Sequence, residues 1–219
     1  MPIFFQQQIN PDTRLGIWKI EEGESFFRDN VPLHRDVTHP HKRLQHLAGR
    51  FLLQFLFPSF PYQLIQLAET RKPFLPEEQF HFSISHCGDY AAAIVSRTIR
   101  VGIDVEIPID KIARIRTKFL SPREVALFRV EGNSADDLQL LTVLWSAKEA
   151  VYKWYGEGQV DFSEQICLTS IDKSEKNIGC YFTKTQTHLR IRYGLFDNLV
   201  LAWVIDNESV SLNNVNLIP

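Results

Sequence analysis

Two carboxylates on one predicted strand are the first residues that suggest chemistry. In the stretch RVGIDVEIPID, residues 100–110, apolar residues alternate with Gly102, Asp104 and Glu106, which is the two-residue period of a half-buried strand. The carboxylates are therefore expected on one face, roughly 7 Å apart at about 3.3 Å of rise per residue. Like charges at this separation repel each other, and a divalent cation would offset the repulsion. An ordinary solvated strand face is the alternative interpretation.

A third carboxylate is predicted on a helix. Treated as a helix, residues 140–155 place an apolar stripe on one side and Trp145, Glu149 and Lys153 on another, at i, i+4 and i+8. A surface Glu–Lys pair is the simpler explanation. A tryptophan rarely lies on a solvated face without a partner, so this face is expected to pack against other residues. If Glu149 meets the two strand carboxylates, the three form a hard-oxygen site that suits Mg²⁺ or Mn²⁺.

Glu124 has a structural explanation. In FLSPREVALF, residues 119–128, Ser121, Pro122 and Glu124 occupy the N-cap, N1 and N3 positions of a predicted helix, which is a capping box. A general base could also stand at this helix entrance. From the residues alone, the cap is the preferred interpretation.

Several short segments could hold a phosphate. FSISHCG, residues 82–88, ends a strand in Ser85 and His86 before a glycine turn, and a hydroxyl and an imidazole can hydrogen-bond a phosphate. Compact basic spots lie in HPHKR (39–43) and RK (71–72), although such runs are more often solvated surface. The sequence has neither a glycine-rich phosphate loop nor a nucleophile elbow, which disfavours a nucleotide cradle of that kind and a Ser/His/Asp hydrolase.

The elements that must position these residues indicate an α+β fold. Helices are predicted at 39–57, around 62–69, at 121–130 and at 135–156, and strands at 15–20, 80–86, 90–96, 99–106, 164–171, 178–184, 188–194 and 198–205. The chain shows the same order of elements two times, with helices followed by a strand meander. This order predicts two similar α/β subdomains related by a pseudo-two-fold, each a small antiparallel sheet packed on helices. We place the N-terminal half at 1–106, the C-terminal half at 107–219, and an active site at their interface.

Composition limits the classes of function. The 219 residues are 44% hydrophobic and include 16 Phe, enough to fill a core. A net charge of −2 gives no overall basic excess for nucleic acid or an anionic membrane. The N-terminus lacks the pattern of a signal peptide, and the apolar run FLLQFLF (51–57) is too short to span a bilayer. The three cysteines show no metal-ligand spacing, so we expect a cytoplasmic protein without a disulfide framework.

Five motifs together resemble the 4′-phosphopantetheinyl transferase superfamily, in its long pseudo-dimeric (surfactin-synthetase-activating) type. They are RKP (71–73), FSISHCG (82–88), VGIDVE (101–106), FLSPRE (119–124) and WSAKEAVYK (145–153). The corresponding family patterns are G-K-P, I-S-H-S, G-I-D-[IV]-E, F-[FSA]-x-x-E and W-[ST]-x-K-E-[AS]-x-x-K. The resemblance covers most of residues 42–155, and VGIDVE and WSAKEAVYK are specific when they occur together at this separation.

The resemblance implies a transferase that moves 4′-phosphopantetheine from coenzyme A to a serine of an apo acyl, peptidyl or aryl carrier protein and releases adenosine 3′,5′-bisphosphate. Asp104, Glu106 and Glu149 resemble the ligands of Mg²⁺, with Mn²⁺ as a substitute, on the coenzyme A pyrophosphate. Glu124 resembles the base that takes the serine proton, directly or through a metal-bound water. Lys153 resembles the cation that stabilises the leaving phosphate.

Further residues resemble coenzyme A contacts, and some depart from the family pattern. The contacts implied by the motifs are Lys72, Ser85 and His86. The segment before the first long helix is less basic than is usual, which leaves Arg43, His46 and Arg50 as candidates for the ribose phosphate. Cys87 replaces the usual serine after S-H. Gly102 is expected to leave space for a bulky ligand such as a metal-bound pyrophosphate.

Two other functions remain open. One is a non-catalytic module of the same fold that binds coenzyme A or a carrier protein, and the other is a Mg²⁺-dependent phosphotransferase with a different donor. For the transferase, the basic and apolar stretch IARIRTKF (112–119) is the expected region for docking an acidic carrier protein. Two halves in one chain predict a self-sufficient monomer.

Overall fold

The computed structural model describes residues 3–31, 37–131 and 134–206. Its helices are α1 (Glu24–Arg28), α2 (Pro40–Leu56), α3 (Asp110–Arg114), α4 (Pro122–Phe128) and α5 (Ala135–Tyr155), with 3₁₀ turns η1 (Tyr62–Leu64) and η2 (Arg116–Lys118). Its strands are β1 (Ile3–Asn10), β2 (Thr13–Lys19), β3 (Gln66–Leu67), β4 (Pro73–Phe74), β5 (His81–Cys87), β6 (Tyr90–Ser96), β7 (Val101–Glu106), β8 (Ile166–Asp172), β9 (Asn177–Phe182), β10 (Thr187–Phe196) and β11 (Leu199–Ile205).

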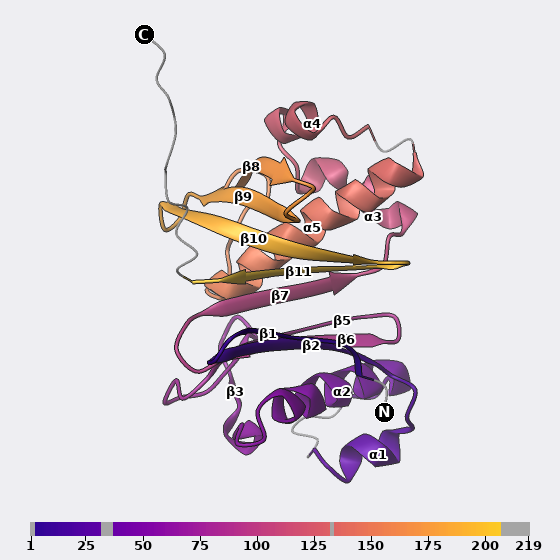
Figure 1. Ribbon diagram of the computed structural model, residues 1–219, viewed down its shortest axis with the longest axis vertical. Coiled ribbons are helices and arrows are strands. Elements are labelled where there is room, and N and C mark those ends of the chain that lie inside the picture. The colour runs from indigo at the N-terminus through magenta and orange to yellow at the C-terminus, as the bar shows by residue number, and fades with distance from the viewer. Residues whose placement is uncertain (1–2, 32–36, 132–133, 207–219) are drawn as a thin grey trace.

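Two antiparallel sheets form the centre of the molecule. The first has the strand order β1-β2-β6-β5 and the second has the order β7-β11-β10-β9-β8. The sheets face each other, with α2 on the outer side of the first and α5 on the outer side of the second (Figure 1). This four-layer arrangement confirms the predicted α+β class, while the pseudo-two-fold relation between the halves stays a prediction.

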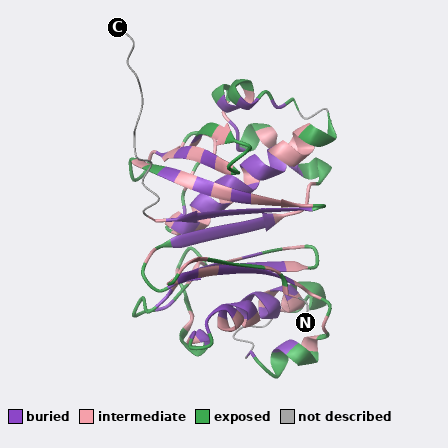
Figure 2. Ribbon diagram, viewed as in Figure 1, coloured by how far each residue is buried: buried purple, intermediate pink, exposed green. Residues whose placement is uncertain are grey.

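The hydrophobic core lies in three layers between these elements. One cluster joins α2 to the first sheet and a second joins α5 to the second sheet. A third lies between the sheets, where Leu15 and Ile94 from one meet Ile103 and Trp203 from the other. Figure 2 shows the resulting burial of the central strands and the exposure of the outer loops. Strand β7 is consequently buried over most of its length, which excludes a solvated position for Asp104, while Glu106 at its end is half-buried.

The predicted meander of residues 80–106 is wrong in its last strand. Strand β7 does not pair beside β6 but beside β11, with Val105 opposite Leu201. Residues 101–106, which we assigned to the N-terminal half, therefore belong by hydrogen bonding to the sheet of the C-terminal half. The short link after β6 lets the chain cross from one sheet to the other, and the choice of partner depends on a strand nearly a hundred residues away.

The predicted helix at 62–69 is also wrong. The segment forms the 3₁₀ turn η1 and then β3, which pairs with β4. Leu64 and Leu67 are both exposed, so the segment has no apolar helical face to bury, and burial of such a face supplies most helical stability in proteins. The other predicted helices and strands are confirmed, with ends that move by a few residues.

None of the described helices is both long enough and apolar enough to cross a membrane.

Gly102 brings α5 against β7. A Cβ at this position would lie 2.1 Å from the carbonyl oxygen of Ala150 and 2.7 Å from the backbone nitrogen of Trp154. Helix backbone therefore fills the space beside Gly102, and our expectation that it leaves space for a ligand is wrong. A glycine in a strand often marks such a close approach of another backbone.

Gly102→Ala should lower the free energy of unfolding by about 2–3 kcal/mol, because backbone atoms of α5 cannot yield without separating the helix from β7. The measurement is equilibrium unfolding in denaturant. Gly194→Ala in β10 is the matched control, since its Cβ would meet only the Phe196 ring at 3.4 Å, and it should change stability by less than about 1 kcal/mol. Equal stability of the two variants would contradict the assigned contact.

Candidate active site

Three side chains from three elements meet at the edge strand β7. The Ser85 hydroxyl on β5 donates to Asp104 Oδ1 at 2.8 Å, and Lys153 Nζ on α5 donates to the same oxygen at 2.6 Å and to Ser85 Oγ at 2.8 Å. Asp104 is 2% exposed and Ser85 is 6% exposed. We call these three residues the β7 triad. Its members come from both halves of the chain, and the predicted active site at their interface stays a prediction.

One oxygen of the triad has no partner. Asp104 Oδ2 is buried and accepts no hydrogen bond from any described residue. A buried carboxylate oxygen without a partner carries a desolvation cost of a few kcal/mol, so such an atom needs an explanation. A ligand cation would supply one.

Two further carboxylates belong to the same electrostatic group. Burial raises the pKa of Glu149 to about 7, and the charges of Asp104 and Glu106 add to the rise. Burial and then Asp104 raise the pKa of Glu106, although Cys87 and Trp145 donate hydrogen bonds that oppose the shift. Burial and the neighbouring carboxylates therefore disfavour the ionised forms of Glu106 and Glu149, and a bound cation would reverse this effect.

The predicted convergence of these carboxylates on one ion is nevertheless not confirmed. In residues 3–31, 37–131 and 134–206, no three Asp, Glu, His or Cys side chains are grouped as a set of metal ligands. Asp104 is instead neutralised by Lys153. The donors fit Mg²⁺ in their chemistry, because Mg²⁺ takes oxygen ligands and needs only one or two protein carboxylates when phosphate and water complete its shell.

The stripe on α5 does not form a simple surface pair. Lys153 pairs with Asp104 rather than with Glu149 four residues before it. The Trp145 ring packs against Phe119 at a centroid distance of 5.1 Å and against Phe162 at 5.6 Å. The expectation that this face of the helix contacts other residues is confirmed.

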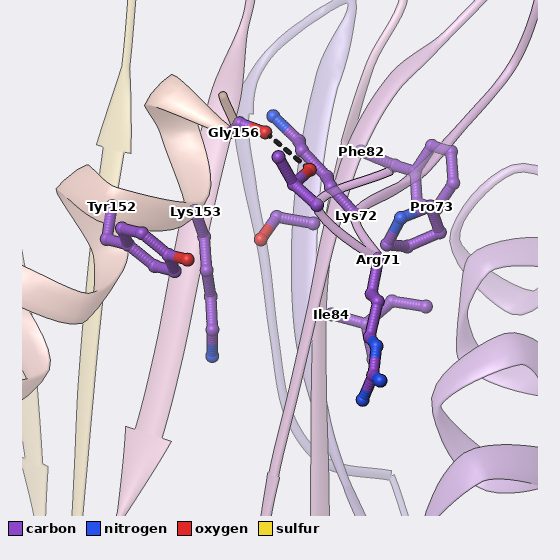
Figure 3. A pocket seen from close by; sticks show the side chains of 10 residues that line it. Arg71, Lys72, Pro73, Phe82, Ile84, Tyr152, Lys153 and Gly156 are labelled. Atoms are coloured by element: carbon purple, nitrogen blue, oxygen red, sulfur yellow. Dashed lines mark hydrogen bonds between the residues drawn. The ribbon is translucent and has the colours of Figure 1, made fainter. Parts of the chain in front are cut away.

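A cavity of about 200 Å³ adjoins the triad. The segment 70–73, β5 and the end of α5 line it, with Lys153 and Tyr152 on the helix side and Arg71 and Lys72 on the other (Figure 3). Pro73, Phe82 and Ile84 add apolar walls. Cationic and apolar surfaces in one cavity suit an anionic ligand that also has an apolar part.

The segment 70–73 is fixed to the end of α5. Thr70 Oγ1 donates to the Gly156 carbonyl at 2.9 Å, and Lys72 Nζ donates to the Trp154 carbonyl at 3.2 Å. Gly156 has a φ of +77°, and a Cβ there would lie 2.4 Å from Lys72 Nζ. Burial, followed by the charge of Arg100, lowers the pKa of Lys72 to about 8. Lys72 lines the cavity, but its ammonium group caps the C-terminal carbonyls of the helix, and its contact with coenzyme A stays a prediction.

His86 lies within electrostatic reach of the triad. Packing around its ring lowers its pKa, and the Lys153 charge lowers it further. The imidazole is therefore mainly neutral at pH 7, with one ring nitrogen as a donor and the other as an acceptor.

The three candidates on the first long helix are not brought to the triad by any contact described. The Arg43 guanidinium binds Glu24 at 2.8 Å and the Val37 carbonyl at 2.8 Å. Arg50 Nη1 lies 3.0 Å from His46 Nδ1. These contacts stay within the N-terminal half, so the geometry adds no support to a ribose-phosphate role.

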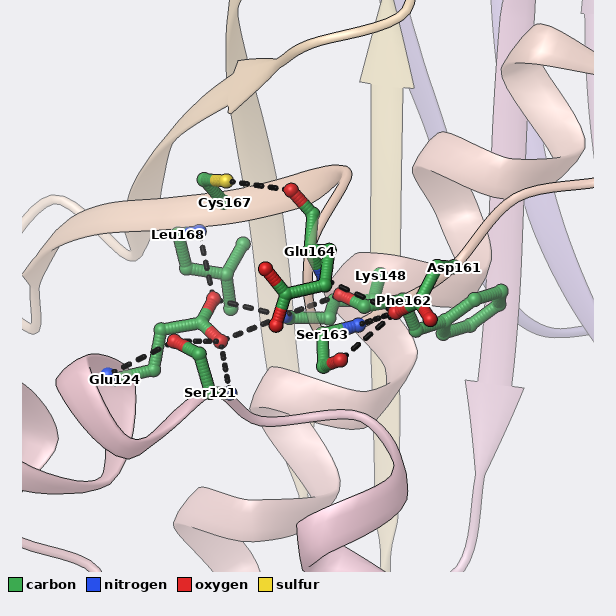
Figure 4. Close-up of polar contacts among 9 residues, drawn as sticks. All are labelled: Ser121, Glu124, Lys148, Asp161, Phe162, Ser163, Glu164, Cys167 and Leu168. Carbon is green, nitrogen blue, oxygen red and sulfur yellow. Dashed lines mark hydrogen bonds and ion pairs between the residues drawn. The ribbon is translucent and has the colours of Figure 1, made fainter.

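Glu124 lies in a buried ion pair (Figure 4). Its Oε2 accepts from the Ser121 backbone at 2.8 Å and its Oε1 accepts from the Leu168 backbone at 2.8 Å, while Lys148 Nζ lies 2.7 Å from Oε1. Glu124 is 2% exposed and Lys148 is 0% exposed. The predicted capping box is confirmed. Both carboxylate oxygens are occupied, so this arrangement does not support Glu124 as a base that meets an incoming hydroxyl.

Lys148 and Ser83 are the residues that we missed. Lys148 lies at i+4 from Leu144 and at i−3 from Val151, within the apolar stripe of its helix, and a lysine there should have predicted a buried partner. Ser83 lies two residues before Ser85 on the same face of β5, and its hydroxyl accepts from the Ile103 backbone at 3.2 Å. No sequence signal marked that contact, because it depends on how the two sheets meet.

Comparison with known proteins finds similarity to 4′-phosphopantetheinyl transferases, the family that the motifs resemble. Residues 100–205 match the family model of the 4′-phosphopantetheinyl transferase superfamily. The chain is 28% identical over 151 residues to enterobactin synthase component D of Salmonella austin, covering 68% of this chain and 58% of that protein. It is 30% identical over 131 residues to a putative 4′-phosphopantetheinyl transferase of Haemophilus influenzae, covering 57% and 54% respectively. It is also 30% identical over 151 residues to the 4′-phosphopantetheinyl transferase HetI of Nostoc sp., covering 62% of each. The chain thus spans a little over half the length of the curated relatives that it matches.

Proposed function

The chain belongs to the 4′-phosphopantetheinyl transferase superfamily, and we propose that it transfers 4′-phosphopantetheine from coenzyme A to a serine of an apo carrier protein and releases adenosine 3′,5′-bisphosphate. The observation that carries this proposal is the β7 triad of Ser85, Asp104 and Lys153, coupled to two more carboxylates beside a cationic cavity. Phosphoryl transfer depends mainly on positioning and on neutralising charge at the phosphates, and this group of residues is suited to both.

Each residue of the group has a proposed part in the reaction. Asp104, Glu106 and Glu149 would hold Mg²⁺, which neutralises charge on the pyrophosphate oxygens when bound. Lys153 lines the cavity, and its ammonium group can donate a hydrogen bond to the leaving phosphate. Glu124 keeps the role of base that its motif implies only if its buried ion pair with Lys148 opens.

The cavity is the proposed site for part of coenzyme A. Lys72 and Lys153 lie on its walls and supply positive charge for the phosphates. The Lys153 charge acts on the His86 imidazole and lowers its pKa, and this proximity supports a proposed contact of His86 with the same ligand. The Ser85 hydroxyl is engaged within the triad by Asp104 and Lys153.

The carrier protein is proposed to dock beside α3 and η2. Lys111, Arg114 and Lys118 are exposed there, and Lys118 lines an open groove of about 490 Å³ that also reaches Glu149. A basic surface continuous with the carboxylate group would attract an acidic carrier and direct its serine toward the reacting phosphate. Both halves contribute residues within one chain, which supports a monomer. The three cysteines are free, which supports a reducing compartment such as the cytoplasm.

Incubation of the chain with coenzyme A, Mg²⁺ and apo carrier proteins tests the proposal. Mass spectrometry should show the mass of phosphopantetheine on the carrier serine and adenosine 3′,5′-bisphosphate in solution. Carriers of the fatty-acid, polyketide and peptide-synthetase classes should all be included, since their docking faces differ. Binding of coenzyme A without transfer to any of them would favour the non-catalytic binding module instead.

A further inference from the structure

We propose that Ser85 is a positioning residue that holds Asp104 with Oδ1 toward Lys153 and leaves Oδ2 for the cation. This inference rests on the proposed function, because it takes Asp104 as a ligand of Mg²⁺. It assigns the serine a role toward the metal site, whereas its motif implies a contact with coenzyme A.

The chemistry of the triad fixes the direction of its hydrogen bonds. The Lys153 ammonium group can only donate, so Ser85 Oγ accepts the proton that lies between them at 2.8 Å. A serine hydroxyl has a single proton of its own. That proton is therefore donated to Asp104 Oδ1 at 2.8 Å. Ser85 is thus committed in both directions within the protein, and it is nearly inaccessible to solvent.

The effect on Asp104 follows from these contacts. The terminal torsion of an aspartate side chain has a broad energy profile, so hydrogen bonds decide which oxygen faces which partner. Lys153 and Ser85 both take Oδ1, and Oδ2 stays buried without a described partner. Side chains that orient a ligating carboxylate typically change metal affinity by about 10- to 100-fold when they are removed.

Ser83 provides an internal comparison. It lies on the same strand and face, it is as buried as Ser85, and its hydroxyl also bonds to β7. Its partner is the backbone nitrogen of Ile103 at 3.2 Å, not a carboxylate. Loss of either hydroxyl removes one contact between the two sheets, but only loss of the Ser85 hydroxyl removes one of the two hydrogen bonds that orient Asp104.

Binding of Mn²⁺ to the full chain, followed by electron paramagnetic resonance with and without coenzyme A, tests the inference without turnover. Without coenzyme A, Ser85→Ala should weaken Mn²⁺ binding by about 10-fold or more, whereas Ser83→Ala, which alters the wall of the cavity but no described hydrogen bond of Asp104, should leave it close to wild type. Ser85→Thr keeps the hydroxyl and should restore binding. In the transfer assay, Ser85→Ala should raise the Mg²⁺ concentration needed for half-maximal activity more than it raises KM for coenzyme A.

The outcomes separate the inference from the proposed function. Unchanged Mn²⁺ affinity in Ser85→Ala, together with a raised KM for coenzyme A, would overturn the positioning role and leave the transferase intact. Equal losses in Ser83→Ala and Ser85→Ala would also overturn it, because the cause would then be looser packing between the sheets. If the wild-type chain transfers phosphopantetheine but binds no Mn²⁺ under either condition, Asp104 is not a metal ligand and the inference fails with that assignment.

Discussion

Glu149→Gln should reduce phosphopantetheine transfer by at least about 100-fold and, at pH 8 without metal, should make the protein more stable than the wild type. The loss of transfer follows from removing one of the three carboxylates proposed to hold Mg²⁺. The gain in stability follows from removing a carboxylate that is half-buried and close to Asp104 and Glu106.

The sign of the stability effect follows from the pKa. Burial raises the pKa of Glu149 from 4.5 to about 7, so the folded state binds more protons than the unfolded state between these values. The free energy of unfolding of the wild type therefore falls as the pH rises from 4.5 to about 7. Glutamine at position 149 cannot ionise, so the variant does not show this fall. The variant should gain on the order of 1–3 kcal/mol at pH 8, and the gain should shrink at pH 5, where Glu149 is mainly protonated.

Thermal unfolding at pH 5 and pH 8, together with the transfer assay, checks both parts of this prediction. Glu175→Gln is a suitable control, because Glu175 is exposed in the turn between β8 and β9 and should alter neither property. Retained Mg²⁺-dependent transfer in Glu149→Gln would show that the metal site is misplaced. A loss of stability at pH 8 would show that Glu149 has a favourable partner in the ionised state.

Glu124→Gln should lower the free energy of unfolding by about 3–5 kcal/mol, because it leaves the buried Lys148 ammonium group without its counter-ion. Lys148 also donates to the Phe162 carbonyl at 2.8 Å, but that neutral acceptor cannot replace the carboxylate. The substitution also weakens the capping box of α4 and the bond to the Leu168 backbone.

This prediction distinguishes the structural role of Glu124 from the role of base. Chemical denaturation should show that the double variant Glu124→Gln/Lys148→Met is closer in stability to the wild type than Glu124→Gln alone, because a buried ion pair can be replaced by apolar groups more cheaply than it can be broken. A base would give the opposite pattern, with turnover lost in Glu124→Gln at unchanged stability.

The elements and the motifs of this protein could be predicted from local sequence. Alternation identified β7, helical spacing identified α2 and α5, and Ser121, Pro122 and Glu124 identified the start of α4, because each signal depends on residues that are neighbours in the chain. The motif resemblance predicted Asp104 and Lys153 as residues of the site, and the structure pairs these two directly.

The partners of those residues were decided by the tertiary structure. Pairing of β7 with β11, rather than beside β6, depends on a strand that forms nearly a hundred residues later. The contact of α5 with β7 at Gly102 fills the space that alternation alone left open for a ligand. The strand pairing and the helix contact both depend on how apolar surface is buried over the whole chain, and a local sequence pattern carries no information about that.

The packing of the whole chain also decided which charged residues pair with each other. Sequence spacing places Lys153 one turn after Glu149 and Glu124 at a helix entrance, where each has a plausible local partner. In the folded chain Lys153 joins Asp104 and Ser85, and Glu124 joins Lys148. Burial makes an unpaired charge costly, so each buried ionic group takes the partner that the packing of helices and sheets brings within reach. The sequence alone predicted which residues would carry the chemistry, and only the tertiary structure decided which of them meet.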